Sequence, residues 1–394
     1  MPGFTGAGPH NFLPAVQNKP MMKKMLPFAA AEYAVIALYQ SFSSLYFAGK
    51  GLETASLAWV QLAVPLASLL GQPLWGALAD KTSRPWVLRA VILAAALAVC
   101  LLPLGQSLLA LAALAGLFAF FQTSIQPLGD ALMLPELNRA GEKLGPLRVT
   151  APLVAMVTAL AAGYGFSSRG EWLPWAVAAF LLLALGFSFL LPGDAAAAAK
   201  KGSLRELFTN RRFMVLLAFS LPLQCSLGLF FCYFPVYFTD TLGGSAPLLG
   251  WAYALGAACE IPFLLLADRL FARLGPGKML LGTGLCLFLR YGLLALCVRP
   301  VPALLTQVLA FGGFASLSFA MAKAAAALVP PSLAARAQTL VALAGFSLAR
   351  GIALAAGGFL TRIFSLNLCF LFAAGLCGGA LLILGKKLWQ TDFS

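Results

Sequence analysis

Residues 76–84 read Gly76-Ala-Leu-Ala-Asp80-Lys-Thr-Ser-Arg84, and they close one long apolar stretch and open the next. Part of this stretch recurs in the second half of the chain, where Leu266-Ala-Asp-Arg269 stands in the place of Leu78-Ala-Asp-Lys81. Arg148 maps onto Arg336 at the same offset. A four-residue match alone is weak, but each copy follows the second apolar stretch of its half. The sequence therefore predicts a parallel duplication of six membrane spans.

The composition excludes a soluble protein. Of the 394 residues, 61% are hydrophobic and 10% are charged, and the mean hydropathy is +0.90. Soluble surfaces need far more charge, whereas lipid accepts apolar side chains directly. The net charge of +14 comes from basic residues between the apolar stretches, which indicates loops at a membrane surface and no nucleic-acid partner. The eight cysteines lie in apolar stretches without a CxxC pair, which is typical of inert, buried thiols.

A helix needs about 20 apolar residues to cross a bilayer. By this criterion the sequence predicts an all-α membrane protein with twelve transmembrane helices in two pseudo-symmetric six-helix bundles. The predicted spans are residues 25–48, 54–79, 85–103, 107–134, 146–166, 172–191, 213–238, 247–267, 277–298, 302–325, 337–361 and 366–386. Glycine and proline inside these spans are tolerated because neighbouring helices satisfy the freed backbone groups.

The basic residues predict the orientation. With both termini in the cytoplasm, most lysines and arginines fall in cytoplasmic loops, as the positive-inside rule requires. The outer loops then hold only Lys50, Arg169, Arg299 and Arg362. We therefore expect a multi-pass protein of the bacterial plasma (inner) membrane.

Four segments are expected along the chain. Residues 1–20 are polar and predict a disordered tail without the features of a signal peptide. Residues 21–191 form the N-terminal bundle and residues 213–394 the C-terminal bundle. Between them, residues 192–212 predict a cytoplasmic linker with a short amphipathic helix, because Ser203 and Glu206 have the spacing of a capping box.

With these residues in view, the chain resembles the major facilitator superfamily. Residues 76–84 are similar to the family signature between helices 2 and 3, G-x-x-x-D-R/K-x-G-R, with Thr82-Ser83 where the signature has glycine. The resemblance implies that Asp80 and Arg84 act in a conformational gate that locks the two halves in one state. Asp268, at the repeated position, is expected to act in the same way. The alternative is that these residues form an ordinary solvated cytoplasmic loop with positive charge and take no part in gating.

Within this superfamily, the chain is similar to the lactose permease and phenylpropionate permease-like (MFS_1-like) branch. The resemblance implies that Asp130 and Arg148 bind substrate, and that Glu260 and Arg290 form a proton site. Arg336-Ala-Gln338 and Gly357-Gly358 also resemble this branch.

Three departures from the branch narrow the expected function. The stretch Leu309–Phe314 lacks the His and Glu of lactose permease, and Ala155 stands where the sugar-stacking aromatic ring is expected. Galactoside specificity is therefore not expected. The signatures of drug antiporters are absent from the predicted fourth and fifth helices.

Ionisable residues inside the spans are functional candidates, because each costs on the order of 3 kcal/mol in lipid. By helical rise, Glu260 and Arg290 lie at similar depths and are expected to meet, either as a proton switch or as a static ion pair. Glu32 is a further proton-site candidate. Arg350 is expected to bind an anionic group or to pair with an acid.

The remaining candidates line the expected cavity. Asp130 and Lys323 are expected either to pair across the halves as an inner gate or to reach the interface separately. Aromatic side chains are available to stack on a ring of the substrate, foremost Tyr39, Phe121 and Tyr233. Most aromatics at such positions serve packing instead.

These features predict a secondary active transporter that moves a small organic solute by alternating access, as a proton-coupled symporter. The alternative is a proton-coupled exporter of drugs or metabolites. An enzyme is not expected, because no catalytic motif, Walker A motif or membrane histidine is present. A proton or sodium gradient takes the place of a cofactor, no metal is expected, and the expected state is a monomer in the lipid bilayer.

Overall fold

The computed structural model describes residues 20–140, 145–165, 170–193, 204–329 and 333–390. Within these ranges the chain is helical and contains no strand. The expected tail lies outside them apart from Pro20, and so does Ser203 of the expected capping box. A bilayer offers no hydrogen-bond partner for backbone N–H and C=O groups. An apolar chain therefore forms helices there, because a helix satisfies these groups internally.

The N-terminal half follows the predicted spans closely. Its helices are α1 (Pro20–Gly49), α2 (Thr54–Lys81), α3 (Arg84–Cys100), the 3-10 turn η2 (Leu102–Leu104), α4 (Leu108–Gln122), α5 (Ile125–Arg139), α6 (Gly145–Gly165) and α7 (Leu173–Ser188). The single span predicted for residues 107–134 is divided into α4 and α5 by a break at Thr123 and Ser124.

The C-terminal half has more breaks. Its elements are α8 (Leu204–Thr209), α9 (Arg211–Val236), the π-helix η3 (Tyr237–Thr241), α10 (Ala246–Ala295), α11 (Pro300–Leu305), the 3-10 helix η4 (Thr306–Gly312), α12 (Phe314–Leu328), α13 (Ala334–Ala342), the π-helix η5 (Leu343–Ala349), α14 (Arg350–Ile363) and α15 (Leu366–Gln390). The short α8 lies in the expected linker.

Helix α10 joins the two spans predicted at 247–267 and 277–298. Gly275 within it has φ +71°, a left-handed conformation that glycine adopts without a steric penalty. Eight helices of the described residues are long and apolar enough to cross a membrane, and α6 and α7 contain shorter apolar stretches. The chain is thus a multi-pass membrane protein.

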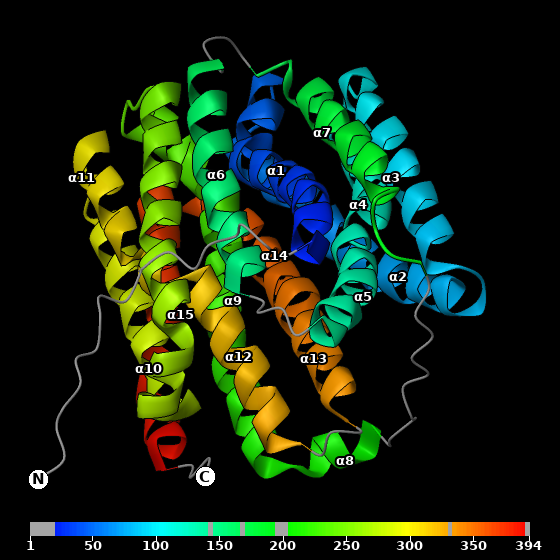
Figure 1. Cartoon of the computed structure of the whole chain (residues 1–394). Helices are drawn as coiled ribbons and strands as arrows, with labels where there is room; N and C mark the ends of the chain where they lie inside the picture. Colours follow the sequence, from blue (N-terminus) through cyan, green and yellow to red (C-terminus); the bar gives the residue numbers. More distant parts are fainter. Residues whose placement is uncertain (1–19, 141–144, 166–169, 194–203, 330–332, 391–394) are drawn as a thin grey trace, which may run out of the picture.

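The two halves of the chain lie against each other chiefly along three helix pairs. Helix α6 packs on α10, α2 on α14, and α1 on α9 (Figure 1). Helix α8 lies at one end of the molecule, near the ends of α12 and α13 (Figure 1), and we call this the α8 end. The opposite end contains the C-terminus of α6 and the N-terminus of α10, and we call it the far end.

At the far end, α6 and α10 come into close backbone contact at Gly163 and Gly250. A Cβ atom built on Gly163 would lie 2.8 Å from Gly250 Cα, so no larger residue fits without a shift of backbone. Beside this contact, Trp251 Nε1 donates a hydrogen bond to the Tyr164 hydroxyl at 3.1 Å. Small residues that let helices approach are the usual means of packing in a membrane.

The other two helix pairs also meet toward the far end. The rings of Trp59 of α2 and Phe359 of α14 pack edge to face, with centroids 5.3 Å apart. Helix α1 also reaches α10, where Phe42 packs on Tyr253 with ring centroids 6.1 Å apart. Deeper in the molecule, the Ser347 hydroxyl donates to the Ser68 hydroxyl at 3.3 Å. Together with the glycine contact, these interactions hold the halves together on the far side of the molecule.

Candidate functional site

Five ionisable side chains lie inside the helical bundle. Glu32, Arg290 and Arg350 are only 3%, 5% and 9% exposed, and Asp130 and Glu260 are half-buried. Charged groups at such positions are costly in a membrane protein and mark candidate functional sites. The five fall into three groups: the acids Glu32 and Asp130, the pair Glu260 and Arg290, and Arg350 by itself.

Arg290 is held by an amide and a ring. Its guanidinium lies 4.2 Å from the centre of the Phe230 ring, and its Nη2 donates to Gln307 Oε1 in a very short hydrogen bond. The Gln307 amide in turn donates to the Ala303 carbonyl at 3.2 Å. Arg290 therefore ties α10 to α9 and η4. The expected ion pair with Glu260 is not formed in the described structure, because Gln307 takes its place, although the two charges are close enough to interact.

Glu260 faces a break in the neighbouring span. Gly313, at φ −90° and ψ −130°, separates the 3-10 helix η4 from α12. The break leaves the first N–H groups of α12 without partners inside their own helix. The backbone N–H of Ala315, in the first turn of α12, lies near the Glu260 carboxylate. A carboxylate at a helix N-terminus is favoured by the helix dipole, and broken helices of this kind line the binding sites of many transporters.

Glu32 and Asp130 are neighbours across α1 and α5. Gly129 makes this possible, because a Cβ atom there would lie 2.7 Å from the Phe28 ring. The two carboxyl groups are close enough for their charges to interact, and Glu32 Oε1 has no hydrogen-bond partner. Two carboxylates that face each other out of water repel, and a shared proton or a bound cation relieves the repulsion. The sequence did not indicate that these two acids meet.

Arg350 lies at the start of α14, against α9. Its aliphatic stem rests on Gly228, where an added Cβ would be 3.2 Å from Arg350 Cβ and Cγ. Its Nε and Nη2 atoms are buried without a hydrogen-bond partner. Three rings surround its guanidinium, with centroids at 4.0 to 5.6 Å: Phe346, Phe231 and Phe314. The structure thus does not pair Arg350 with an acid among the described residues, one of the two roles expected from the sequence.

The three predicted aromatics lie in different surroundings. Tyr39 of α1 packs on Phe118 at 4.8 Å, and its buried hydroxyl has no partner. Phe121, at the end of α4, packs on Trp75 at 5.5 Å. Tyr233 is completely buried, and its hydroxyl lies 3.4 Å from that of Thr361. In this conformation Tyr233 packs α9 on α14 and faces no open space. Arg148 lies in the first turn of α6, and its side chain is outside the described part.

The predicted gate residues form ion pairs within each half. Asp80 and Arg84 are joined at 2.9 Å between the end of α2 and the start of α3. Lys323 of α12 binds Asp268 of α10 at 2.8 Å. The expected pair of Lys323 with Asp130 is therefore wrong for this conformation, because the repeated acid of its own half takes the lysine.

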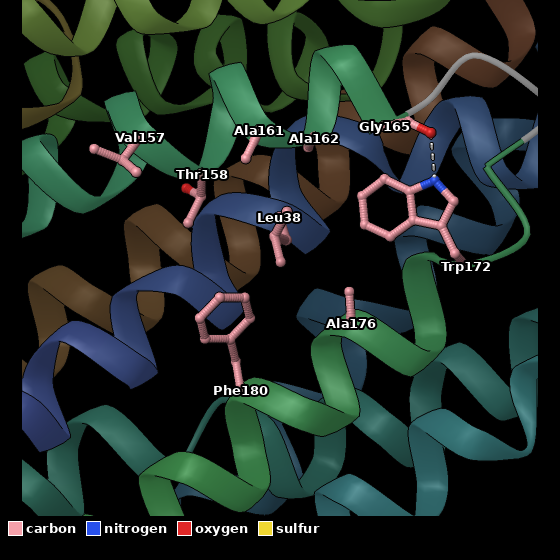
Figure 2. Close-up of a pocket in the computed structure, with 9 residues that line it drawn as sticks. All are labelled: Leu38, Val157, Thr158, Ala161, Ala162, Gly165, Trp172, Ala176 and Phe180. Atoms are coloured by element: carbon pink, nitrogen blue, oxygen red, sulfur yellow. Dashed lines mark hydrogen bonds between the residues drawn. The ribbon is translucent and has the colours of Figure 1, made fainter.

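A groove on the outside of the N-terminal half has a different chemistry. It encloses about 420 Å³ between α1, α6 and α7, and Figure 2 shows its lining side chains, with the Trp172 indole donating to the Gly165 carbonyl at 3.0 Å. The lining residues are Leu38, Val157, Thr158, Ala161, Ala162, Gly165, Trp172, Ala176 and Phe180. Since no charged side chain lines it, this groove suits lipid chains better than a polar solute.

Sequence reasoning missed the amides and the phenylalanine rings. Gln224 and Gln307 are 5% and 1% exposed. Gln307 binds Arg290, and Gln224 contacts Gly345 of η5, the segment directly before Arg350. An amide in the middle of an apolar stretch is the signal that would have found both. Phe314 and Phe346, in contrast, carry no signal in a chain with 31 phenylalanines.

Comparison with known proteins identifies transporters as relatives of this chain. The chain is 30% identical to a maltose permease of Geobacillus stearothermophilus over 239 residues and 26% identical to an uncharacterized transporter, YwbF, of Bacillus subtilis over 234 residues. These matches cover 58% and 57% of the chain and 59% and 57% of the relatives, so the chain spans less than two thirds of either relative's length.

A solved structure supports the same fold over a longer range. A point mutant of the nucleoside transporter NupG superposes with a TM-score of 0.81 at 16% identity, covering 93% of this chain and 98% of that one. These relatives are transporters and not enzymes. The model of the MFS_1 like family matches residues 28–372, which is most of the sequence, and the chain therefore belongs to this family of major facilitator transporters.

Proposed function

We propose that this protein is a proton-coupled symporter that moves a small organic solute across a bacterial plasma membrane by alternating access. Family membership supports transport, and the buried acids support coupling to protons. Its architecture would be two six-helix bundles: with α10 counted as two spans and α1, α6 and α7 added to the other long helices, the chain crosses twelve times. The charge of the loops supports cytoplasmic termini, which makes the α8 end the cytoplasmic end.

The observation that carries the proposal is the position of Glu260. Its carboxylate lies near the N-terminus of α12 and is close enough to Arg290 for the two charges to interact. When the span containing α12 moves relative to α10, the carboxylate loses part of this stabilisation and takes up a proton. Substrate binding that favours one arrangement would then be coupled to protonation, because a ligand shifts a conformational equilibrium by its differential affinity. Glu32 beside Asp130 is a second place for a transported proton.

Proteoliposomes with an inward proton gradient test the proposal. A pool of small organic solutes is supplied outside, and mass spectrometry identifies those that accumulate with and without a protonophore. We expect Glu260→Gln to abolish accumulation against the gradient while solute exchange between the two sides persists. Glu53→Gln, at an exposed position before α2, is the matched control and keeps accumulation.

Three results would contradict the proposal. Accumulation by Glu260→Gln at the wild-type level removes Glu260 as the coupling site. Accumulation that ignores the protonophore removes proton coupling and favours a sodium gradient or facilitated diffusion. Extrusion of solutes on reversal of the gradient, without uptake, would identify an exporter instead.

A further inference from the structure

The two buried arginines of the C-terminal half differ in one respect. Arg290 has an acceptor in Gln307 and the charge of Glu260 nearby. Arg350 is more than nine-tenths buried, yet its Nε and Nη2 atoms donate to nothing, and no acid pairs with it within the described residues. A buried guanidinium without a partner is costly, so its retention calls for an acceptor supplied from elsewhere.

The free atoms form one edge of the guanidinium. Nε and Nη2 point the same way, and this is an edge on which arginine binds the two oxygens of a carboxylate in a bidentate manner. Three phenylalanine rings surround the guanidinium, so its surroundings are largely apolar. The Phe346 ring is 4.0 Å from the guanidinium carbon, and the rings of Phe231 and Phe314 are each 5.6 Å away.

A second polar group lies one turn away on α9. Gln224 precedes Gly228 by four residues, so both face the same neighbouring helix. Gly228 packs against Arg350. Gln224 packs against Gly345 of η5, because a Cβ atom built on Gly345 would lie 3.1 to 3.3 Å from atoms of the Gln224 side chain. The Gln224 Oε1 atom is buried without a partner. The seam between α9 and the segment η5–α14 therefore contains two donors without partners, Nε and Nη2 of Arg350, and one acceptor without a partner, Oε1 of Gln224.

We propose that this seam binds an organic monocarboxylate, with the carboxylate on the Nε–Nη2 edge of Arg350 and an apolar body against the phenylalanine rings. Gln224 Oε1 would accept a hydrogen bond from a hydroxyl or amine in those acids that carry one. This inference rests on the proposed function and names its substrate class. An inorganic anion can accept hydrogen bonds from Arg350 but has no apolar part to pack on the rings. A neutral aromatic amide can pack on the rings but lacks the negative charge that Arg350 binds. Arg350 is a substrate-binding residue in this view, and Phe346 determines specificity for an apolar body.

Thermal unfolding of the full-length protein in detergent tests the inference. The probes are sodium benzoate, sodium gluconate, sodium chloride and benzamide at equal ionic strength. A ligand that binds only the folded protein raises the melting temperature with its concentration. We expect benzoate to stabilise the protein, gluconate and chloride to do so at least tenfold less effectively, and benzamide not at all.

Variants assign the effect to the seam. Arg350→Gln is expected to abolish the rise in melting temperature caused by benzoate. Arg350→Lys keeps the positive charge but cannot bind a carboxylate in a bidentate manner, and it is expected to weaken the apparent affinity for benzoate at least tenfold. Phe346→Leu is expected to bring benzoate down to the level of gluconate. Arg362→Gln, at an exposed position on the same helix, retains the full shift.

Specific outcomes overturn the inference. These are an equal benzoate shift in Arg350→Gln, a benzamide shift as large as that of benzoate, or no shift with any acid in the wild type. If proteoliposomes accumulate neutral solutes with the proton gradient while acids have no effect, the proposed function stands and this inference fails. If nothing is transported but benzoate still binds through Arg350, the site stands and symport fails.

Discussion

Individual residues show how a membrane protein retains charges inside its helices. Arg290 is surrounded by a ring, an amide and a nearby carboxylate, so its charge is balanced within the protein. Lys323 and Asp268 form a pair that remains partly open to water, with 41% and 70% of their side-chain surfaces exposed. An exposed pair contributes about 0–1 kcal/mol, whereas a buried hydrogen-bonded charge contributes considerably more.

Removal of the amide that receives Arg290 should therefore destabilise the protein. Gln307→Leu leaves a buried guanidinium N–H without an acceptor, and the expected cost is about 1–3 kcal/mol. Thermal unfolding in detergent measures this loss. Gln106→Leu, at an exposed position, is the control and should change the melting temperature little. Equal melting temperatures for Gln307→Leu and the wild type would mean that another group accepts the hydrogen bond.

Helices determine where these residues meet, and several of them are interrupted at the site. The break at Gly313 points the N-terminus of α12 at Glu260, and the π-helix η5 ends directly before Arg350. Irregular backbone inside a membrane persists only where protein or a polar cavity surrounds it. A π-helix within a span is likewise a frequent feature of functional sites. The interruptions therefore coincide with the charged groups.

The contact of α6 with α10 should control closure of the far end. Gly163→Leu places a side chain where Gly250 Cα and the Ala246 carbonyl lie within 3 Å of the first added atom, so the two helices must separate. We expect higher labelling of a cysteine introduced at the buried Ala159, one turn before Gly163 on α6, measured with a membrane-impermeant thiol reagent in a background without the eight native cysteines. Gly186→Leu on α7, where an added Cβ meets nothing within 4 Å, should leave labelling unchanged. Unchanged labelling in Gly163→Leu would show that this contact does not keep the far end closed.

At the scale of the whole molecule, the contacts between the halves define one state of a transport cycle. They join α6 to α10 and α2 to α14 toward the far end. The predicted gate pairs at the other end each stay inside one half. Among the described residues, the halves are joined at the far end and the predicted gate pairs stay within one half. Under the proposed alternating access, this arrangement corresponds to a state open toward the α8 end, which is the cytoplasmic side under the proposed orientation.

A reversible cross-link tests this assignment. Tyr164→Cys and Trp251→Cys replace two side chains joined by a hydrogen bond of 3.1 Å, in a background without the eight native cysteines. A short bifunctional thiol reagent should stop transport, because the far end can no longer open, and reduction of a cleavable reagent should restore it. Each single cysteine variant, treated in the same way, should keep its activity. Full transport by the cross-linked protein would mean that this end does not open during the cycle.

The sequence alone predicted an all-helical, multi-pass membrane protein, because lipid requires long apolar helices and each one is visible in about 20 residues of chain. The signature at residues 76–84 likewise indicated the superfamily. Glu32, Glu260, Arg290 and Arg350 were also found from the sequence, since an ionisable residue in an apolar stretch needs no further context to be noticed. Asp130 was found from the family resemblance.

Only the tertiary structure decided which of these charges meet. Lys323 selects Asp268 over Asp130, Arg290 selects Gln307 over Glu260, and Glu32 lies beside another acid. Depth along a helix can be counted from the sequence, but rotation about the axis and the identity of the neighbouring helix cannot. Both depend on packing between distant segments, and here they depend on breaks at Gly313 and η5 that shift the register of the side chains.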